Sequence, residues 1–503
     1  VIDKYEIDGI WADGECWGAK LDWSDEAKRR FTAETGIEDI PTGPGDEHWL
    51  EWKQFHRRAF ERYLAHWVGA LHEYKPGFQI TSNWMYTPHA PKPVEVDLDF
   101  LSGDYSPTAS VDRARVEARY LASTDMPWDL MAWGFNWVEG TGHSLKTPEH
   151  LMQEAGVVLM QGGGFQVYNQ PERTGYVPPF LIETLGQVAD FCRARQEVSF
   201  KSETVPQVAV VLSYESWADN CQSVFVPAYV EAVEGILHAL LESHYSVDIL
   251  AEHQLGPRLR EFPLVVIPDA HKLMPGFREA LVEYVRGGGS LLVTHRTAHL
   301  FEEELGVTIG EEHHAPAELG VGDGFVSVRG PWSRVELAGA QGLHSWYPDR
   351  VMRPEEAEWA ATINELGEGT IVGVYGPIEV TNFHSHHPFI RQFIAEVAHA
   401  AFPEPSVELE GPPTVDVALR RTADGRLSVH LLNTTGLPLG NRTVTDYIPG
   451  TGEMELRVRT RQRPQKVAME PAGQELAWRW DPATEWCSIR VPSVAIHDVI
   501  VLE

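Results

Sequence analysis

Two carboxylates stand two residues apart in the segment IDGIWADGECWG, which covers residues 7–18. They are Asp13 and Glu15, and Trp11 and Trp17 flank them. Alternate side chains of a strand share a face, and two residues of strand rise separate Cα atoms by about 6–7 Å. One ligand could therefore touch both acids. The spacing predicts a pair for acid–base or nucleophilic chemistry, and the alternative is a solvated loop start, where acids are common.

Polar and aromatic groups also follow the other apolar segments of the first 200 residues. We expect strands at residues 7–13, 78–83, 98–103, 128–133 and 165–168, and each is followed by an aromatic ring beside a hydrogen-bonding group. Trp presents a flat apolar face with one N–H donor, which suits the C–H face of a sugar. The substrate-binding candidates are Trp11, Trp17, Asn83, Trp84, Asp104, Tyr105, Trp133, Asn136, Trp137 and Tyr168.

The elements that must position these groups alternate between strands and helices. Amphipathic helices are predicted at about 48–73, 111–123, 148–160 and 179–195. This alternation predicts a parallel α/β fold. We interpret the five units as the last five of a (β/α)8 TIM barrel, whose active sites lie at the C-terminal ends of the strands. If Ile10 packs against the helices, the acid pair faces the barrel axis; an open doubly wound sheet is the structural alternative.

Two further domains are expected after the barrel portion at 1–204. Residues 205–402 show parallel strand–helix alternation, which predicts a flavodoxin-like α/β domain, and no glycine-rich phosphate loop follows its first strand. Residues 403–503 contain short alternating strands separated by turn signals, which predict an antiparallel β-sandwich.

The charge and the cysteine content narrow the classes of partner that this chain could bind. The 503 residues carry 73 acidic and 41 basic side chains, a formal charge of −32, which disfavours nucleic acid and anionic membranes as partners. The four cysteines are scattered, and no apolar stretch is long enough to span a bilayer. We expect no cofactor and no metal; His384, His386 and His387 are expected to cap or pack. The chain begins without Met and without a visible signal peptide. We favour a cytoplasmic location and do not assign one.

The chain resembles known glycoside hydrolases in its layout. The segments QITSNWMY, LDFLSGDYSP, MPWDLMAWGFNW and QVAVVLSYESW resemble the family 42 β-galactosidases, which have a barrel, a flavodoxin-like trimerisation domain and a small β domain. The family 42 nucleophile, a Glu on the seventh barrel strand, corresponds to Ala132 here. The segment GIWADGE instead resembles the fourth strand of family 29 α-L-fucosidases, whose Asp nucleophile maps onto Asp13. The combination resembles hypothetical glycosyl hydrolase 6 and the family 151 α-L-fucosidases.

This resemblance implies a retaining exo-glycosidase that acts on a neutral terminal sugar of a glycoside or oligosaccharide. Asp13 would be the nucleophile and Glu15 the acid–base residue, with Asp104, Glu139 and Glu172 in reserve. An α-L-fucosidase is expected first and a family 42 β-galactosidase second; a non-catalytic carbohydrate-binding homologue is the alternative of another class. The trimerisation domain implies a homotrimer.

Overall fold

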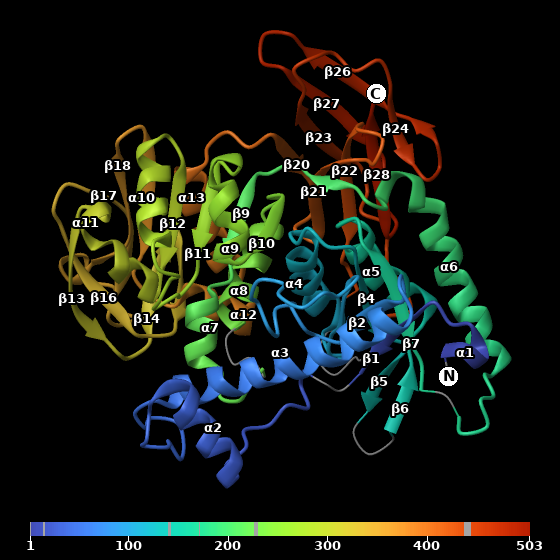
Figure 1. Ribbon diagram of the computed structural model, residues 1–503. Helices are drawn as coiled ribbons and strands as arrows, with labels where there is room; N and C mark the ends of the chain where they lie inside the picture. The colour runs from blue at the N-terminus through green and yellow to red at the C-terminus, as the bar shows by residue number, and fades with distance from the viewer. Residues whose placement is uncertain (1, 14–15, 139–141, 171, 226–229, 437–443) are drawn as a thin grey trace.

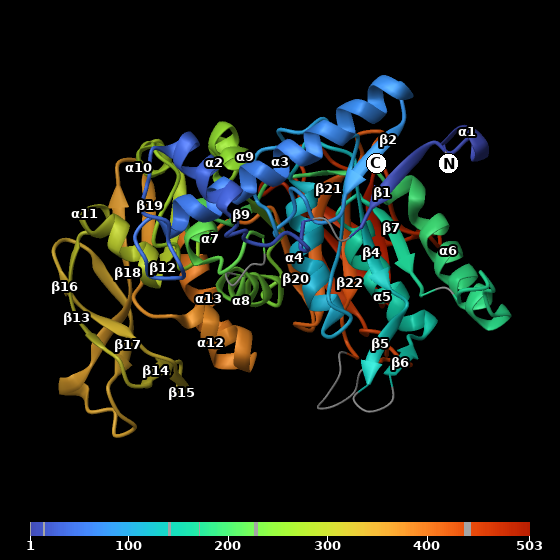
Figure 2. The same ribbon diagram turned by 60° about the horizontal axis from the view of Figure 1, so that its bottom comes forward.

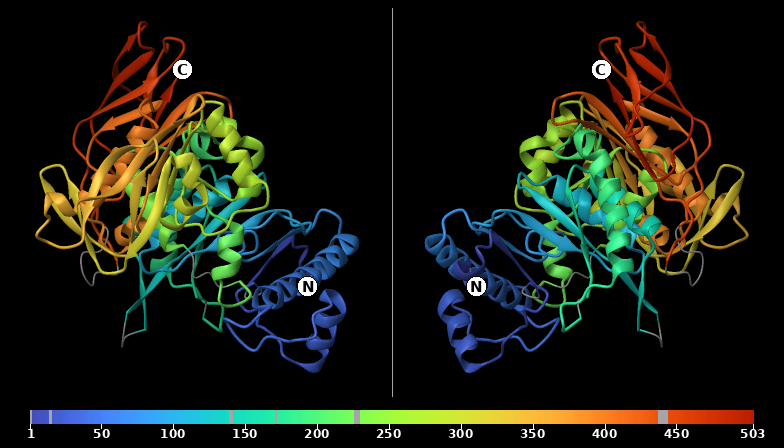
Figure 3. Two further views of the ribbon diagram at one scale, coloured as in Figure 1. Left: turned by 90° about the vertical axis from the view of Figure 1, so that its left-hand side faces the viewer. Right: turned by 90° about the vertical axis from the view of Figure 1, so that its right-hand side faces the viewer.

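The computed structural model describes residues 2–13, 16–138, 142–170, 172–225, 230–436 and 444–503. Figure 1 shows the chain in three parts: the N-terminal third, a central part built on a large sheet, and the C-terminal sheets. The C-terminal sheets and helix α2 (Asp25–Thr35) lie at opposite ends of the molecule (Figure 3). In the described part of the chain, no helix is both long and apolar enough to cross a membrane.

Parallel strands form the core of the N-terminal part. They are β1 (Gly9–Ala12), β2 (Gln79–Ser82), β3 (Leu101–Asp104), β4 (Trp128–Trp133) and β7 (Gly164–Tyr168). β1 pairs with β2, and β3, β4 and β7 pair in that order. The Trp84 N–H donates to the Ser102 carbonyl at 3.1 Å and links β2 to β3. The predicted parallel α/β unit is confirmed, but the described strands form an arc and not a closed barrel.

The expected helices connect these strands. They are α3 (Trp49–Tyr74), α4 (Ser110–Ala122), α5 (Pro148–Leu159) and α6 (Pro179–Ser199). Thr147 caps α5 by accepting the His150 N–H, and Pro148 stands at the first turn, where a missing N–H costs nothing. The sequence did not predict α2, the short α1 (Ile2–Tyr5) or the hairpin of β5 (Phe135–Val138) and β6 (Gly142–Leu145).

Helix α3 ties the N-terminal part to the central part, as Figure 2 shows. The buried Lys53 ammonium donates to the carbonyls of Ala218, Asp219 and Cys221 at 2.6–3.0 Å. These carbonyls lie at the C-terminal end of α7 (Tyr214–Asn220), where the helix dipole favours a cation. Burial lowers the pKa of Lys53 to about 8.

The central part is built on a nine-stranded sheet in the order β10-β9-β11-β12-β19-β18-β17-β14-β15. The first five of these strands are parallel, in the order 2-1-3-4-5 of a flavodoxin-like sheet. The antiparallel strands β18, β17, β14 and β15 extend this sheet and were not predicted. The elements are β9 (Val208–Val211), α7, α8 (Glu231–Leu241), β10 (Val247–Leu250), α9 (Glu252–Leu255), η1 (Gly256–Glu261), β11 (Leu264–Ile267), α10 (Phe277–Arg286), β12 (Ser290–Thr294), η2 (His295–Phe301), α11 (Glu302–Leu305), β13 (Val307–His313), β14 (Ala317–Val321), β15 (Gly324–Val328), β16 (Trp332–Leu337), β17 (Gln341–Tyr347), η3 (Pro354–Glu356), β18 (Glu358–Leu366), β19 (Gly369–Val374), α12 (Ile378–Ser385) and α13 (Pro388–Ala401).

Two antiparallel sheets form the C-terminal part, as the turn signals predict. One has the order β20-β23-β27-β26, and the other β25-β24-β28-β22-β21-β8. Residues 474–481 form two strands in different sheets, because the chain crosses between the sheets at buried Leu476. The elements are β8 (Glu203–Thr204), β20 (Val407–Glu410), β21 (Val415–Arg421), β22 (Leu427–Asn433), β23 (Met454–Arg459), β24 (Val467–Glu470), β25 (Gln474–Glu475), β26 (Ala477–Asp481), β27 (Trp486–Val491) and β28 (His497–Leu502).

A buried ion pair holds the C-terminal sheet against the N-terminal part. The Arg115 guanidinium of α4 makes two hydrogen bonds of 2.8 Å to the Asp416 carboxylate of β21. Both side chains are almost fully buried. A pair of this kind is costly to break from one side, because the remaining charge has no partner.

Two strand positions bear on which face the candidate acids occupy. Packing of Ile10 against the helices is the condition for the acid pair to face the barrel axis, but the Ile10 side chain is 41% exposed. The resemblance to family 42 places the position of the missing nucleophile at Ala132. In β4, however, Asp129 and Trp133 bond to inward groups, so strand alternation turns Ala132 to the opposite face, where it is buried in the main core with Val157 and Val158.

Candidate active site

A chain of hydrogen bonds crosses the inner face of the strand arc. The Trp11 indole N–H donates to the Ser102 hydroxyl at 2.7 Å, and that hydroxyl donates to the Asp129 carboxylate. Gln166 donates to the other Asp129 oxygen at 2.5 Å. The chain joins β1, β3, β4 and β7. We call Trp11, Ser102, Asp129 and Gln166 the floor of the site. Two residues after each of them, another side chain points inward, closer to the C-terminal end of its strand.

Two of the acids singled out in the sequence, Asp13 and Asp104, stand at the next inward positions. Asp13 follows β1, and its Oδ1 accepts a hydrogen bond of 3.1 Å from the buried Asn83 amide. Asp104 ends β3, and its Oδ2 accepts the Trp133 indole N–H at 3.1 Å. Asp13 is exposed, whereas Asp104 is 6% exposed. One carboxylate therefore meets solvent and the other is largely withdrawn from it, both at the rim that barrel active sites occupy.

The surroundings of Asp104 favour its protonated form. Burial is the main cause that raises its pKa to about 6, and the negative charge of Asp13 adds to this effect. The Trp133 and Trp84 hydrogen bonds and the charge of His89 oppose it. The second carboxyl oxygen, Oδ1, is buried and has no hydrogen-bond partner among the described residues. A carboxyl group with this pKa can give and take a proton near neutral pH, which general acid–base catalysis requires.

Aromatic rings continue the site from the end of β2. Trp84 packs edge-on against Trp17, with ring centroids 6.3 Å apart, and stacks on His89 at 4.2 Å. Trp84 has φ 68° and Tyr86 has φ 63°, in a left-handed region that bulky residues rarely adopt. Backbone of this kind persists where the surrounding structure fixes it, and it is common at functional sites.

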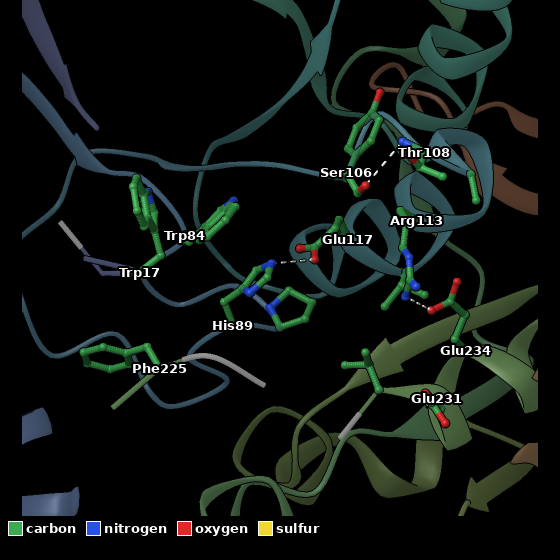
Figure 4. Close-up of a pocket in the computed structure, with 15 residues that line it drawn as sticks. Trp17, Trp84, His89, Ser106, Thr108, Arg113, Glu117, Phe225, Glu231 and Glu234 are labelled. Carbon is green, nitrogen blue, oxygen red and sulfur yellow. Dashed lines mark hydrogen bonds and ion pairs between the residues drawn. The ribbon is translucent and has the colours of Figure 1, made fainter. Parts of the chain in front are cut away.

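A cavity of about 600 Å³ opens beside these rings, and in it Trp17, Trp84 and His89 face residues of the central part (Figure 4). His89 lies 3.4 Å from the Glu117 carboxylate. Across the cavity, Arg113 of α4 pairs with Glu234 of α8. Burial raises the pKa of Glu234 to about 7, and Arg113 opposes this rise. The cavity therefore combines an aromatic wall with ionisable groups and opens next to the Asp104 end of β3.

A second aromatic group stands over β4 and β7. Trp133 has its ring centroid 5.4 Å from Phe135, 6.1 Å from Trp137 and 5.9 Å from Tyr168. Trp137 is 52% exposed, so its ring can cover a ligand. These rings surround the Asp104 hydrogen bond and give the site apolar faces on two sides.

The structure does not bring every predicted residue into this group. The Tyr105 hydroxyl donates to the buried Glu154 at 3.4 Å, and Tyr105 lines the cavity beside Trp84. The side-chain Oδ1 of Asn136 accepts the backbone N–H of Trp137 at 2.9 Å in the β5 hairpin. Glu172 is exposed. Glu15 and Glu139 lie outside the described residues.

Sequence reasoning missed the floor residues Ser102, Asp129 and Gln166, and it missed His89 and Glu117 of the cavity. The signal for the floor was available, since Ser102 and Asp129 precede Asp104 and Met131 by two positions and share their face. His89 and Glu117 carried no such signal, because a loop and a helix bring them together.

Comparisons with known proteins agree with this architecture. Residues 206–310 match the family described as Beta-galactosidase trimerisation domain. A 233-residue alignment is 27% identical to beta-galactosidase BglY of Alicyclobacillus acidocaldarius, and it covers 41% of this chain and 32% of that protein. The chain thus spans about a third of the length of this curated relative.

Two solved structures extend the likeness to nearly the whole chain. Alpha-L-fucosidase isoenzyme 2 from Paenibacillus thiaminolyticus has a TM-score of 0.82 and 17% identity, over 100% of this chain and 78% of its own. A beta-galactosidase from Bacillus circulans sp. alkalophilus has a TM-score of 0.69 and 14% identity, over 96% of this chain and 77% of its own. The chain therefore has the fold of these glycoside hydrolases, and its residues 206–310 match the β-galactosidase trimerisation domain.

Proposed function

We propose that this protein is a retaining exo-glycoside hydrolase, with Asp13 as the nucleophile and Asp104 as the acid–base residue. The observation that carries the proposal is the contrast between the two acids. Asp13 is exposed and held by Asn83, whereas burial raises the pKa of Asp104 to about 6. Two carboxyl groups in different environments divide the roles of nucleophile and general acid in retaining glycosidases.

The proposed reaction has two steps. The Asp13 carboxylate attacks the anomeric carbon, the glycosidic C–O bond breaks, and Asp104 gives its proton to the leaving oxygen. Asp104, now ionised, then takes a proton from water as the water attacks the glycosyl–Asp13 ester. The sugar leaves with its original anomeric configuration, Asp13 is again a carboxylate, and Asp104 is again protonated. Glu15 is the rival for the acid–base role.

A neutral sugar with an apolar edge suits the aromatic surroundings. Trp17, Trp84 and Trp137 offer partly exposed rings near the two acids. An α-L-fucoside is the first substrate class, since the 6-deoxy sugar carries a methyl group for such rings, and the likeness to the Paenibacillus fucosidase supports it. A β-galactoside is the second, supported by the trimerisation-domain match and the BglY alignment. Loss of both activities with retained sugar binding would favour a carbohydrate-binding homologue.

The proposal includes the division into domains at 1–204, 205–402 and 403–503, and a homotrimer formed through the central domain. The family match to a trimerisation domain at residues 206–310 supports the assembly. Multi-angle light scattering tests it: a mass of three chains is expected, and a monomer at working concentration contradicts it.

A panel of aryl glycosides tests the function. The wild-type protein and Asp13→Asn are assayed on α-L-fucoside, β-galactoside and other neutral glycosides. We expect wild-type turnover of one class and none by the variant, because the amide is a poor nucleophile. Asp8→Asn is the matched control, since Asp8 is an exposed acid just before β1. Full turnover by Asp13→Asn refutes the assignment.

A further inference from the structure

A second cluster of ionisable side chains lies in the central part, far in sequence from the proposed active site. It stands at the C-terminal edge of the parallel sheet, where α/β folds place their ligands. Asp269 follows β11, His295 follows β12, and Glu379 stands in the first turn of α12, after β19. Three adjacent strands therefore converge on the cluster, and none of its members takes part in the mechanism above.

The three side chains offer their ligand atoms to a common point. One carboxylate oxygen of Asp269, one of Glu379 and one ring nitrogen of His295 all lie within 4.8 Å of one another. The His295 Nδ1 atom is 2.8 Å from an Asp269 oxygen. Asp269 and Glu379 are buried, and His295 is partly buried.

Glu379 is the observation that points to a ligand. Its side chain is fully buried, and within the described part of the chain neither carboxylate oxygen has a hydrogen-bond partner. A buried carboxylate without partners is costly. A cation bound between Glu379, Asp269 and His295 would remove this cost.

We propose that Asp269, His295 and Glu379 bind one divalent transition-metal ion, such as Zn²⁺ or Mn²⁺. Two carboxylates and one imidazole suit these ions, and three protein ligands are a common number for zinc. Mg²⁺ and Ca²⁺ prefer sites made only of oxygen ligands. Arg296 donates to both oxygens of Asp269 at 2.6 and 2.9 Å, which orients this carboxylate as outer hydrogen bonds commonly orient metal ligands.

The bound ion would brace one wall of the cavity. The Asn382 amide of α12 donates to the Gly235 carbonyl of α8 at 2.9 Å. Gly235 is needed at this contact, because a Cβ there would lie 1.9 Å from the Glu379 carbonyl oxygen. Helix α8 carries Glu234 and Glu231, which line the cavity of Figure 4. An ion on Glu379 thus fixes the first turn of α12, on which α8 rests.

Metal analysis of the purified protein tests the site without any activity assay. The chelator-treated protein is dialysed against Zn²⁺, Mn²⁺ or Mg²⁺, and the bound metal and the melting temperature are measured. We expect one equivalent of Zn²⁺ or Mn²⁺ per chain, a raised melting temperature, and little retention of Mg²⁺. No bound transition metal, or equal retention of Mg²⁺, overturns the proposal.

Matched variants locate the ion. Glu379→Gln keeps the volume of the side chain and is expected to lose the bound equivalent and the melting shift. His295→Asn alters a partly exposed side chain and decides the question if Glu379→Gln does not fold. Glu304→Gln is the control, since this buried acid of the same part pairs with Arg278 instead and should leave the bound equivalent intact. Wild-type metal content in the folded Glu379→Gln or His295→Asn protein contradicts the assignment.

Discussion

Replacing Asp104 by Asn should weaken catalysis without destabilising the protein at alkaline pH. The pKa of this carboxyl rises from 3.8 to about 6 on folding, chiefly through burial. At 1.36 kcal/mol per pKa unit, the shift amounts to about 3 kcal/mol against the ionised form. The native state binds the proton more tightly than the unfolded state, so stability falls as pH rises from about 4 to about 6.

The Asp104→Asn variant has no proton to lose at this position, so its free energy of unfolding should not show that fall. The new amide oxygen can still accept the Trp133 N–H, while the amide N–H₂ faces the apolar side of the site at a cost of about 1–3 kcal/mol. We therefore expect urea unfolding at pH 8 to give a variant about as stable as the wild type or up to about 2 kcal/mol more stable. At pH 4 the variant should be the less stable of the two.

The catalytic activity of Asp104→Asn, in contrast, should fall. For glycosides with poor leaving groups, kcat/KM should fall by about 10²–10⁴-fold, and the alkaline limb near pH 6 should disappear. Asp498→Asn is the control, since burial also raises the pKa of this acid, in the C-terminal part. The control should alter only the stability profile. An unchanged alkaline limb in Asp104→Asn shows that another group, with Glu15 the first to be tested, supplies the proton.

Three other substitutions test neighbouring parts of the account. Trp133→Phe removes the N–H that lowers the pKa of Asp104, so the alkaline limb of kcat/KM should move to higher pH; a limb at the wild-type position contradicts this role. Asn83→Ala frees the nucleophile and should lower kcat more than it raises KM, measured by steady-state kinetics; an effect on KM alone would indicate a binding role. Arg115→Ala leaves the buried Asp416 with only the more distant Arg119, at 3.8 Å, and should cost about 3–5 kcal/mol in urea unfolding, against less than about 1 kcal/mol for the exposed Arg29→Ala.

The strand ends were the most predictable part of the molecule. Strand β4 and the start of α5 lie where the apolar run and the Thr147–Pro148 signal place them. The rim acids Asp13 and Asp104 follow from the same reasoning, because parallel strands present their C-terminal ends on one edge. Trp11 precedes Asp13 by two positions, and its indole N–H donates to Ser102 of β3.

Groups that depend on tertiary contacts were not predictable. The raised pKa of Asp104 depends on its burial, which no local pattern reveals. His89 meets Glu117 only because a loop folds back on α4, and Glu234 enters the cavity from another part of the chain. The antiparallel strands between β13 and β18 have mixed polar patterns, since several of them are half exposed. The direction of Ala132 was not predictable either, because a single position of register decides which face a side chain occupies.

Mapping of the covalent glycosyl–enzyme tests the central claim most directly. A 2-fluoro glycosyl fluoride of the sugar that the wild type hydrolyses slows the second step, so the intermediate accumulates and peptic peptides can be sequenced by mass spectrometry. We expect one added glycosyl group per chain, on Asp13, and none in Asp13→Asn. A label on any other carboxylate, or full turnover without a trapped intermediate, contradicts it.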